Sequence, residues 1–349
     1  VFGPLEMTRS TFDLSIASTY PFAQSHRIDP EGNISVDHRQ PDAAAFSSSG
    51  GVFTTANDLA RYLIMHMNHG RFGESTVLSK DSVFSMHTPA VSRCTPDGDG
   101  YGLGFYTGQH RGLPLIWHWG RTLRYGGLII AIPTKRLGLV LLYNRQTERF
   151  DADGFAARAM DVLLGESAPR SAPPPGSDHL AVSMGLWGRR QGRYLGPNIG
   201  LADLCISSGS ASLHWNGVAA SLAPYRSGVL IGRTVSGESV SVGAVPGTND
   251  YLMINGTPAR RRDVQLEQPL QAELDCYVGH YGLFDRMVFA INDGVLTLAS
   301  ETHGRIFDCL SIGPRKFACN IGTVEFPEGD YAKAPSLKFA DFAKFDRRG

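Results

Sequence analysis

The residue types best suited to chemistry stand in the stretch LPLIWHWGRTLRYGGLIIAIP, from Leu113 to Pro133. Two strand-like runs flank a polar segment, and His118, Trp119 and Gly120 stand where the first run ends. A glycine at a strand end lets a ligand approach the backbone, and an unpaired amide there can stabilise an oxyanion in acyl transfer. His118 is therefore the candidate catalytic residue, and a structural histidine at a strand end is the alternative.

Two helices are predicted ahead of this stretch. Thr55 is suited to cap the first, Asp58 stands where a capping box places its acidic partner, and Gly70 is placed at C′. The second helix is predicted from Ser79 and stops before Pro89, because proline cannot continue a helix. Both helices belong to the part of the chain that must position His118.

Four strands are predicted over residues 101–107, 113–119, 128–132 and 137–143. Only Thr134 to Arg136 separate the last two, which is typical of a hairpin. The segment FAARAMDVLLG then predicts a helix that ends at a glycine. His118 is thus expected at the end of a strand inside an antiparallel sheet.

The second half of the chain has a different pattern. Residues 167–180 are rich in proline and serine and are predicted to be a linker. Beyond them, short alternating runs separated by Gly, Asn, Ser and Pro predict two small antiparallel β domains, over 181–265 and 266–349. A weak internal repeat supports two units, because Gly-x-Tyr opens a similar layout at residues 192 and 279.

Five segments of the first half resemble a known family when they are taken together. In order they are FGPLEM, SSGGVFTTANDLARYL, YGLGFY, HWG and IAIPTKRLGLVLLYN. They are similar to the C-terminal half of the serine β-lactamase and penicillin-recognising family, which includes class C β-lactamases, D,D-peptidases, D-aminopeptidases and esterases. The resemblance implies an α/β (α+β) domain over residues 1–166, incomplete at its N-terminus, followed by two barrel-like β domains such as D-aminopeptidases carry.

The resemblance also implies roles for matched positions. His118 stands where the family places a Lys or His that faces the catalytic serine, which favours the D-aminopeptidase and esterase branches. In the family this Lys or His begins a three-residue motif that ends in glycine, and Gly120 matches that glycine. Arg121 matches the next residue, whose backbone N–H contributes to the oxyanion hole. The family has a small residue in place of Trp119 and glycines in place of Arg121 and Arg124, so an altered substrate or lost activity is expected.

The family's nucleophile motif is absent from this sequence. Serine and lysine must stand three residues apart, so that the lysine can help to remove the serine proton. None of the six lysines has a serine three residues before it, and the Tyr-x-Asn element would precede residue 1. Either the sequence is part of a longer hydrolase, which its start at Val1 favours, or it is a catalytically inactive binding or regulatory protein.

Composition narrows the partners. Lysine and arginine together number 33, as do aspartate and glutamate. The formal net charge is therefore +0 and does not favour binding to nucleic acid. No apolar run approaches the ~20 residues that span a bilayer. The five cysteines form no CxxC pair, and neither a metal nor an organic cofactor is implied. A small-molecule or short-peptide substrate is expected, together with a missing N-terminal segment or a homo-oligomer, and the compartment stays open.

Three weaker patterns have a functional and a structural interpretation each. Arg260-Arg261-Arg262 is a phosphate patch or a solvated connector, with the connector favoured. His66-x-x-His69 is half of a metal site or a solvated helix end. Cys309 and Cys319 form a disulfide or stay as buried free thiols, and free thiols are favoured.

Overall fold

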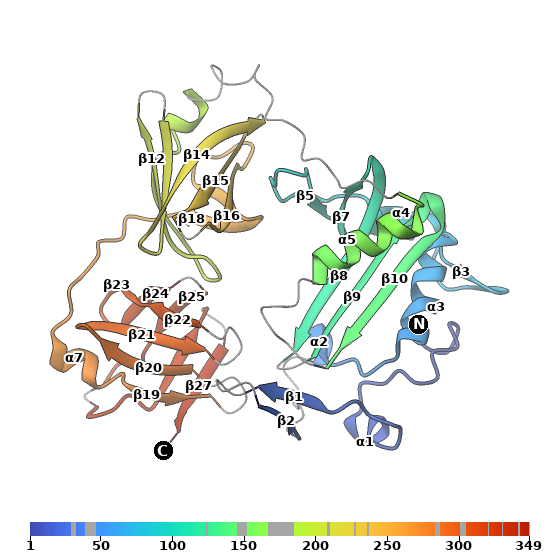
Figure 1. Cartoon of the computed structure of the whole chain (residues 1–349), viewed down its shortest axis with the longest axis horizontal. Coiled ribbons are helices and arrows are strands. Elements are labelled where there is room, and N and C mark those ends of the chain that lie inside the picture. Colours follow the sequence, from blue (N-terminus) through green and yellow to red (C-terminus); the bar gives the residue numbers. More distant parts are fainter. Residues whose placement is uncertain are drawn as a thin grey trace. The chain divides into compact units, whose positions relative to one another are not determined.

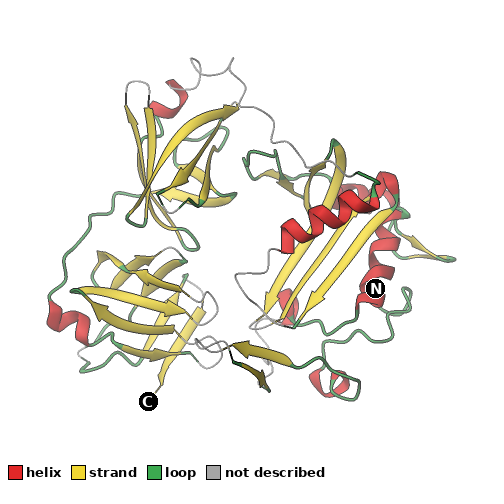
Figure 2. Cartoon of the chain, in the orientation of Figure 1, coloured by secondary structure: helices red, strands yellow, loops and turns green. Residues whose placement is uncertain are grey.

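The structure is a computed structural model that describes most of the chain. The described residues are 1–28, 33–38, 47–122, 125–144, 152–166, 185–207, 210–226, 228–235, 237–282, 287–300, 305–319, 321–329, 331–340 and 343–348. The chain divides into two compact units, one of residues 1–92 and 99–171, the other of residues 93–98 and 172–349. Figure 2 shows that the described helices gather mainly in the first unit, whereas the second is built almost wholly of strands. The predicted linker, 167–180, lies outside the described residues.

The first unit is built on a six-stranded antiparallel sheet. Its strands, in spatial order, are β10 (Leu137–Tyr143), β9 (Tyr125–Ile132), β8 (Leu113–Thr122), β7 (Tyr106–His110), β6 (Gly100–Tyr101) and β5 (Val91–Ser92). Two further hairpins pair β1 (Ser25–Ile28) with β2 (Ile34–Asp37) and β3 (Arg71–Phe72) with β4 (Ser75–Thr76). The helices are α1 (Leu14–Ala17), α2 (Ser47–Gly50), α3 (Ala56–Met67), α4 (Lys80–His87) and α5 (Ala152–Leu163).

Helices cover both faces of this sheet because β9 is apolar on both. Ile130 and its alternate neighbours pack against Ala156 and Met160 of α5, which lies across β8 to β10 in Figure 1. Ala131, the residue after Ile130, packs in a separate cluster with Leu63 of α3. Successive strand residues point to opposite faces, so each helix receives every second residue of β9. The strand that pairs with β8 is therefore held from both sides.

The predicted strand over 101–107 is wrong, because two strands separated by a turn occupy this segment. The amide of Gly102 donates to the carbonyl of Phe105 at 2.8 Å, and Gly104 has a positive φ of 80°. Phe105 is 1% exposed and packs in the core under α3. The turn therefore serves to bury Phe105, and β6 and β7 lie on its two sides.

The predicted helix ends are confirmed with small differences. Thr55 and Ser79 cap α3 and α4 with their side chains, as expected. At the other end of α3, the amide of His69 donates to His66 and that of Gly70 to Met65. This is a Schellman motif in which His69 occupies C′ and Gly70 occupies C″, one position beyond the prediction.

The second unit contains the two predicted barrel-like β structures. The first is a closed barrel of β11 (Gly192–Gly196), β12 (Gly200–Ser207), β13 (Ser210–Trp215), β14 (Val218–Arg226), β15 (Val229–Thr234), β16 (Ser239–Ala244), β17 (Tyr251–Ile254) and β18 (Thr257–Arg261). The second is a nine-stranded antiparallel sheet with the order β22-β21-β20-β19-β27-β26-β25-β24-β23. Each structure has its own apolar core.

The bounds of the second sheet follow the order of the chain. The short helix α7 (Gln271–Asp275) precedes it. Its strands are β19 (Gly279–Tyr281), β20 (Met287–Asn292), β21 (Val295–Ser300), β22 (Arg305–Asp308), β23 (Leu310–Gly313), β24 (Lys316–Cys319), β25 (Gly322–Glu325), β26 (Ser336–Phe339) and β27 (Ala343–Arg348). No helix among the described residues is long and apolar enough to cross a membrane.

The internal repeat has a physical basis in a buried tyrosine and an arginine. Tyr194 and Tyr281 are both fully buried, and each hydroxyl donates to the carbonyl four residues earlier. Arg261 donates to the Tyr194 hydroxyl at 3.0 Å, and Arg347 donates to the Tyr281 hydroxyl at 3.1 Å. Each guanidinium also lies 5.5 Å from the centre of its tyrosine ring. The same device thus closes the last strand of each β structure onto its first.

The cysteines are free thiols, as favoured by the sequence. Cys309 and Cys319 are both buried, and a hydrogen bond with the Cys319 thiol together with burial raises the pKa of Cys309. The pair therefore belongs to the apolar core of the second β structure.

Candidate functional site

The predicted site residues lie at the part of β8 that extends beyond β7. The last pair between these strands joins Tyr106 to Trp117, whereas β9 continues to pair with β8 as far as Thr122. From His118 onward, β8 therefore has a strand neighbour on one side only among the described residues. The prediction that the strand ends at this motif is wrong, because β8 continues to Thr122, and the residues lie instead along an edge of the strand.

Gly120 leaves space at this edge. It lies opposite Gly127 in the register, and a Cβ built on Gly120 would meet nothing within 4 Å. The neighbouring Gly126 is required for a different reason, because a Cβ there would lie 2.0 Å from the ring of Tyr143. Two opposed glycines thus make this stretch of the hairpin thin, which suits close approach of a substrate to the backbone.

His118 is half-buried and is held by a tyrosine from β6. The Tyr101 hydroxyl lies 3.1 Å from His118 Nε2. The rings of Tyr101 and His118 meet at an edge-to-face angle of 64°. Tyr101 thus reaches the imidazole although β6 and β8 are not neighbours in the sheet. It is the closest described polar partner of the candidate catalytic residue.

An aromatic group surrounds this pair. Tyr106 stacks on Trp117 with ring centres 5.6 Å apart and on Trp119 with centres 6.5 Å apart and rings 3° from parallel. Tyr106 also meets Tyr101 edge to face at 4.8 Å. Trp119 is 45% exposed, so its indole presents an apolar surface beside Gly120. The arrangement offers a flat apolar wall next to a histidine.

Burial sets the protonation of both polar groups. Desolvation lowers the pKa of His118, and a hydrogen bond with the backbone of Trp119 opposes this shift. Desolvation and then the neighbouring Tyr106 raise the pKa of Tyr101. At neutral pH the phenol is therefore protonated and the imidazole is neutral. The phenol then donates to Nε2, which places the remaining imidazole proton on Nδ1.

This pair has the composition of a proton-transfer site. A neutral imidazole accepts a proton, and a phenol beside it can donate one, both within hydrogen-bond reach of an adjacent reacting group. Gly120 leaves room for such a group next to the imidazole. The side chain of Arg121 is not among the described ones, and its backbone pairs with Gly126. Arg124 lies outside the described residues.

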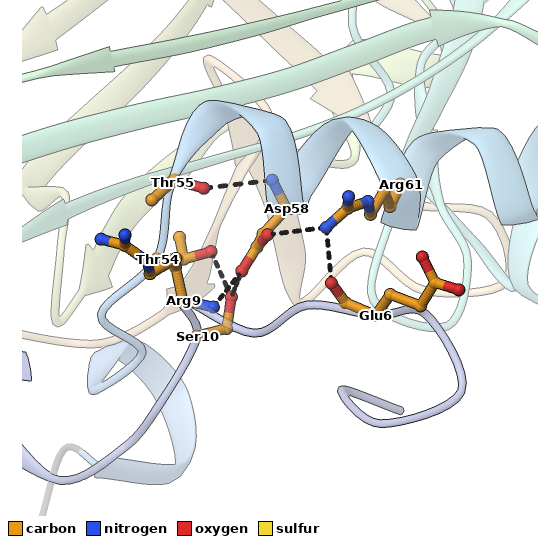
Figure 3. A network of polar contacts seen from close by, with 7 residues as sticks. All are labelled: Glu6, Arg9, Ser10, Thr54, Thr55, Asp58 and Arg61. Atoms are coloured by element: carbon orange, nitrogen blue, oxygen red, sulfur yellow. Dashed lines mark hydrogen bonds and ion pairs between the residues drawn. The ribbon is translucent and has the colours of Figure 1, made fainter. Parts of the chain in front are cut away.

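The motif segments at the start of the chain build the scaffold rather than the site. Figure 3 shows Asp58, which is 2% exposed, joining α3 to the N-terminal segment. Its Oδ2 accepts from the amide of Arg9 at 2.9 Å and from the hydroxyl of Ser10 at 2.8 Å. Only half of the predicted capping box is present, because the Asp58 carboxylate bonds to this distant segment rather than to the cap residue. The cap itself is made by Thr55, which accepts from the Asp58 amide at 3.2 Å.

Arg61 completes this network on the next helical turn. Its Nη1 donates to the carbonyl of Glu6 and lies 3.4 Å from Asp58 Oδ1. The segment FGPLEMTRS is thereby attached to α3 by both backbone and side-chain groups. Leu5 and Met7 are buried beside Met65 of α3. The two motifs therefore specify how one segment packs on the helix that supports the sheet.

The sequence missed Tyr101 and Tyr106 as site residues. The motif YGLGFY contains both, yet its pattern indicated only a strand over residues 101–107. The pairing of β6 with β7 and of β7 with β8 brings them to His118. The other histidine pattern is not a metal site here: His66 Nδ1 lies 3.1 Å from His87 Nε2, and the described residues contain no group of three metal-ligating side chains.

Comparisons with known proteins agree with this architecture. Residues 1–162 match the family model described as Beta-lactamase. Among solved structures, SurE is 19% identical with a TM-score of 0.51, and the match covers 69% of this chain and 56% of SurE. At this identity the likeness shows a shared fold. Comparison with curated proteins finds no match.

Two further solved structures are more distant in shape. The octameric penicillin-binding protein homologue from Pyrococcus abyssi is 21% identical with a TM-score of 0.42, over 74% of this chain and 58% of that one. A class C beta-lactamase is 16% identical with a TM-score of 0.37, over 49% of this chain and 50% of that one. The matches thus span less than two thirds of each of these proteins. The similarity to the Beta-lactamase family model covers residues 1–162, just under half of the chain.

Proposed function

We propose that the first unit supplies one wall of an acyl-transfer site and that His118 is its proton-transferring residue. The observation that carries this proposal is the hydrogen bond between His118 Nε2 and the Tyr101 hydroxyl, at a β8 edge where Gly120 leaves open space. The serine nucleophile and its lysine would come from a segment that is not in this sequence, because no lysine here follows a Ser-x-x spacing. The match of residues 1–162 to the Beta-lactamase family model supports the reaction class.

The chemistry assigned to each residue follows from its position. Attack of the serine on a carbonyl carbon places negative charge on the carbonyl oxygen, and the backbone amide of Arg121 would face that oxygen. His118 and Tyr101 would transfer the proton between the serine and the leaving group. Hydrolysis of the acyl-enzyme by water would then release a carboxylic acid and restore the serine.

Small D-amino-acid amides, short peptides or small esters are the proposed substrates. A neutral imidazole is a weak counter-ion for the carboxylate of a penicillin, and burial keeps His118 neutral at pH 7. The exposed indole of Trp119 offers an apolar contact for a small side chain or acyl group. These two features favour uncharged amides and esters over β-lactams.

The first experiment is to sequence the coding region upstream of the codon for Val1. The proposal expects a Ser-x-x-Lys motif followed by Tyr-x-Asn in the same reading frame. The chain as printed should not be labelled by a fluorescent penicillin or a fluorophosphonate. If the frame has no such motifs, or if the printed chain is labelled covalently, the proposal fails, and in the first case a non-catalytic binding protein becomes the better interpretation.

The second experiment uses the protein that carries the upstream motifs. D-alanine p-nitroanilide, p-nitrophenyl butyrate and nitrocefin represent amides, esters and β-lactams, and the first two should be turned over faster. His118→Ala should lower kcat for them by about a hundredfold or more, because proton transfer contributes on the order of 10²–10⁴ to rate. His38→Ala, at an exposed histidine of the same unit, is the control. Equal kcat values for the two variants would remove His118 from the mechanism.

A further inference from the structure

A pocket of about 290 Å³ lies inside the second unit, where strands of the two β structures meet. The amide of Thr323 donates to the carbonyl of Pro197 at 3.1 Å and joins the two structures beside the pocket. Gly322 permits this approach, because a Cβ there would lie 2.3 Å from the Pro197 oxygen. The pocket is therefore enclosed by elements that are fixed to each other.

Among the charged side chains of its lining, cationic ones predominate. Arg260, Arg262 and Lys316 line the pocket together with a single acidic residue, Glu325. Lys316 Nζ lies 3.3 Å from Glu325 Oε2, so these two charges offset each other. The two arginines have no ion pair with an acidic side chain in the described part of the chain. Two guanidinium groups are thus left to face the pocket.

The arginine triplet separates into a structural residue and two lining residues. Arg261 donates to the hydroxyl of Tyr194 and to the carbonyl of Arg189 inside the first barrel. Arg260 and Arg262 are exposed on the other side of the chain, because alternate residues of an extended segment point in opposite directions. Arg260 also lies 5.7 Å from the ring centre of Tyr251, which holds its guanidinium at the pocket.

An unsatisfied hydroxyl lies in the same wall. Thr323 lines the pocket, and its Oγ1 is buried without a hydrogen-bond partner among the described residues. This oxygen is shielded, so the hydroxyl is part of the packed wall and does not offer a donor to the pocket. The apolar part of the lining consists of one leucine, one isoleucine, two prolines and one valine.

We propose that this pocket binds a small organic carboxylate with an apolar tail. The carboxylate would accept hydrogen bonds from Arg260 and Arg262, whose planar guanidinium groups match a carboxylate. The tail would lie on the apolar surface of the lining. The volume suits a chain of a few carbons, and the proposal is independent of the acyl-transfer function.

Hexanoate is the probe for the first experiment, with hexanol and inorganic phosphate as comparators. Titration into the ¹⁵N-labelled protein should shift the amide signals of Thr323 and Val324 saturably, with a millimolar Kd. Hexanol lacks the charge and phosphate lacks the tail, so each should bind at least about tenfold more weakly. An absence of saturable shifts with hexanoate, or equal or tighter binding of either comparator, would overturn the proposal.

Two kinds of variant assign the effect to this pocket. Arg260→Gln with Arg262→Gln should raise the Kd for hexanoate by at least about tenfold, whereas Arg233→Gln, at another arginine of the first barrel, should leave it unchanged. Thr323→Val keeps the side-chain shape and should leave the Kd unchanged without lowering the Tm, because it removes a shielded, unpartnered hydroxyl. Unchanged affinity in the double variant would contradict the assignment.

Discussion

At the scale of single residues, the Tyr101 hydroxyl is a hydrogen-bond partner of the neutral form of His118. The phenol donates to Nε2 over 3.1 Å, and only the neutral imidazole has a lone pair there to accept it. Burial also disfavours the imidazolium and lowers the pKa of His118. Both effects act in the same direction, so His118 is kept available as a base at neutral pH.

Tyr101→Phe should therefore raise the pKa of His118. The substitution removes the hydrogen bond that stabilises the neutral ring, while the aromatic packing against Tyr106 is retained. The measurement is a pH titration of the His118 ring nitrogens by NMR. Tyr331→Phe removes a hydroxyl from an exposed tyrosine elsewhere and should leave the titration unchanged. A fall in the His118 pKa in Tyr101→Phe would show that the imidazole donates in this hydrogen bond.

The sequence predicted His118 and Gly120 but not their tyrosine partner. His118, Trp119 and Gly120 form one short motif at the end of an apolar run, so the local pattern was sufficient to select them. Tyr101 stands 17 residues away and reaches Nε2 only through the pairing of three strands. The register of those strands depends on the turn that buries Phe105, and no local pattern specified that turn.

At the scale of elements, α3 and α4 meet through a buried pair of histidines. His66 is 1% exposed, and desolvation followed by the charge of His87 lowers its pKa to about 3. Desolvation followed by the charge of His69 lowers the pKa of His87 to about 4. Below about pH 6.5 these two histidines become protonated in the unfolded chain but stay neutral in the folded chain. The free energy of unfolding should therefore fall as the pH decreases from about 6.5 toward 4.

This pH dependence is testable by thermal unfolding at pH 7 and pH 5. The Tm should be lower at pH 5 by several degrees, and His87→Gln should reduce that difference, because one of the two titrating groups is removed. His38→Gln replaces an exposed histidine of the same unit and should leave the difference as it is in the parent protein. A Tm that is higher at pH 5 would show that the pair is charged in the folded state.

Asp58 stabilises the attachment of the N-terminal segment to α3. Asp58→Ala should lower the free energy of unfolding by about 2–3 kcal/mol, because it removes the buried carboxylate that accepts from the Arg9 amide and the Ser10 hydroxyl. Urea unfolding gives the value. Asp81→Ala, at an exposed acid in the first turn of α4, is the matched control and should cost less than about 0.5 kcal/mol. Equal losses in the two variants would show that Asp58 acts only through its charge near the start of the helix and not through these two hydrogen bonds.

Elements defined by local signals were predicted well. The caps at Thr55 and Ser79 and the strand Leu137–Tyr143 match the structure. These features depend on neighbouring residues only. The role of Asp58 was only half predicted, since its carboxylate bonds to residues 48 and 49 positions away. Contacts of that range leave no periodic trace in the sequence.

At the scale of the whole molecule, the second half repeats one structural plan. Turn residues between alternating runs sufficed to predict two β structures. They did not predict closure of the first barrel, because that depends on Tyr194 of β11 pairing with Arg261 of β18. The Gly-x-Tyr repeat was visible in the sequence, whereas the arginine that bonds to each tyrosine was not, since Arg261 and Arg347 stand 67 and 66 residues away.

The repeat predicts that Arg261→Lys and Arg347→Lys have similar effects. Each substitution keeps the charge but removes the forked donors that reach a tyrosine hydroxyl and a backbone carbonyl together. Each should lower the free energy of unfolding of its own β structure by about 1–3 kcal/mol, since buried acceptors lose their donor. Hydrogen exchange in increasing urea resolves the two structures by their core amides.

Arg260→Lys is the matched control for this last prediction, because its side chain is exposed on the neighbouring position of the same segment. It should change the free energy of unfolding by less than about 0.5 kcal/mol. If Arg347→Lys destabilises the second structure while Arg261→Lys behaves like the control, the two tyrosine–arginine pairs are not equivalent. The repeat would then describe only the path of the strands, and closure of the first barrel would depend on its apolar core.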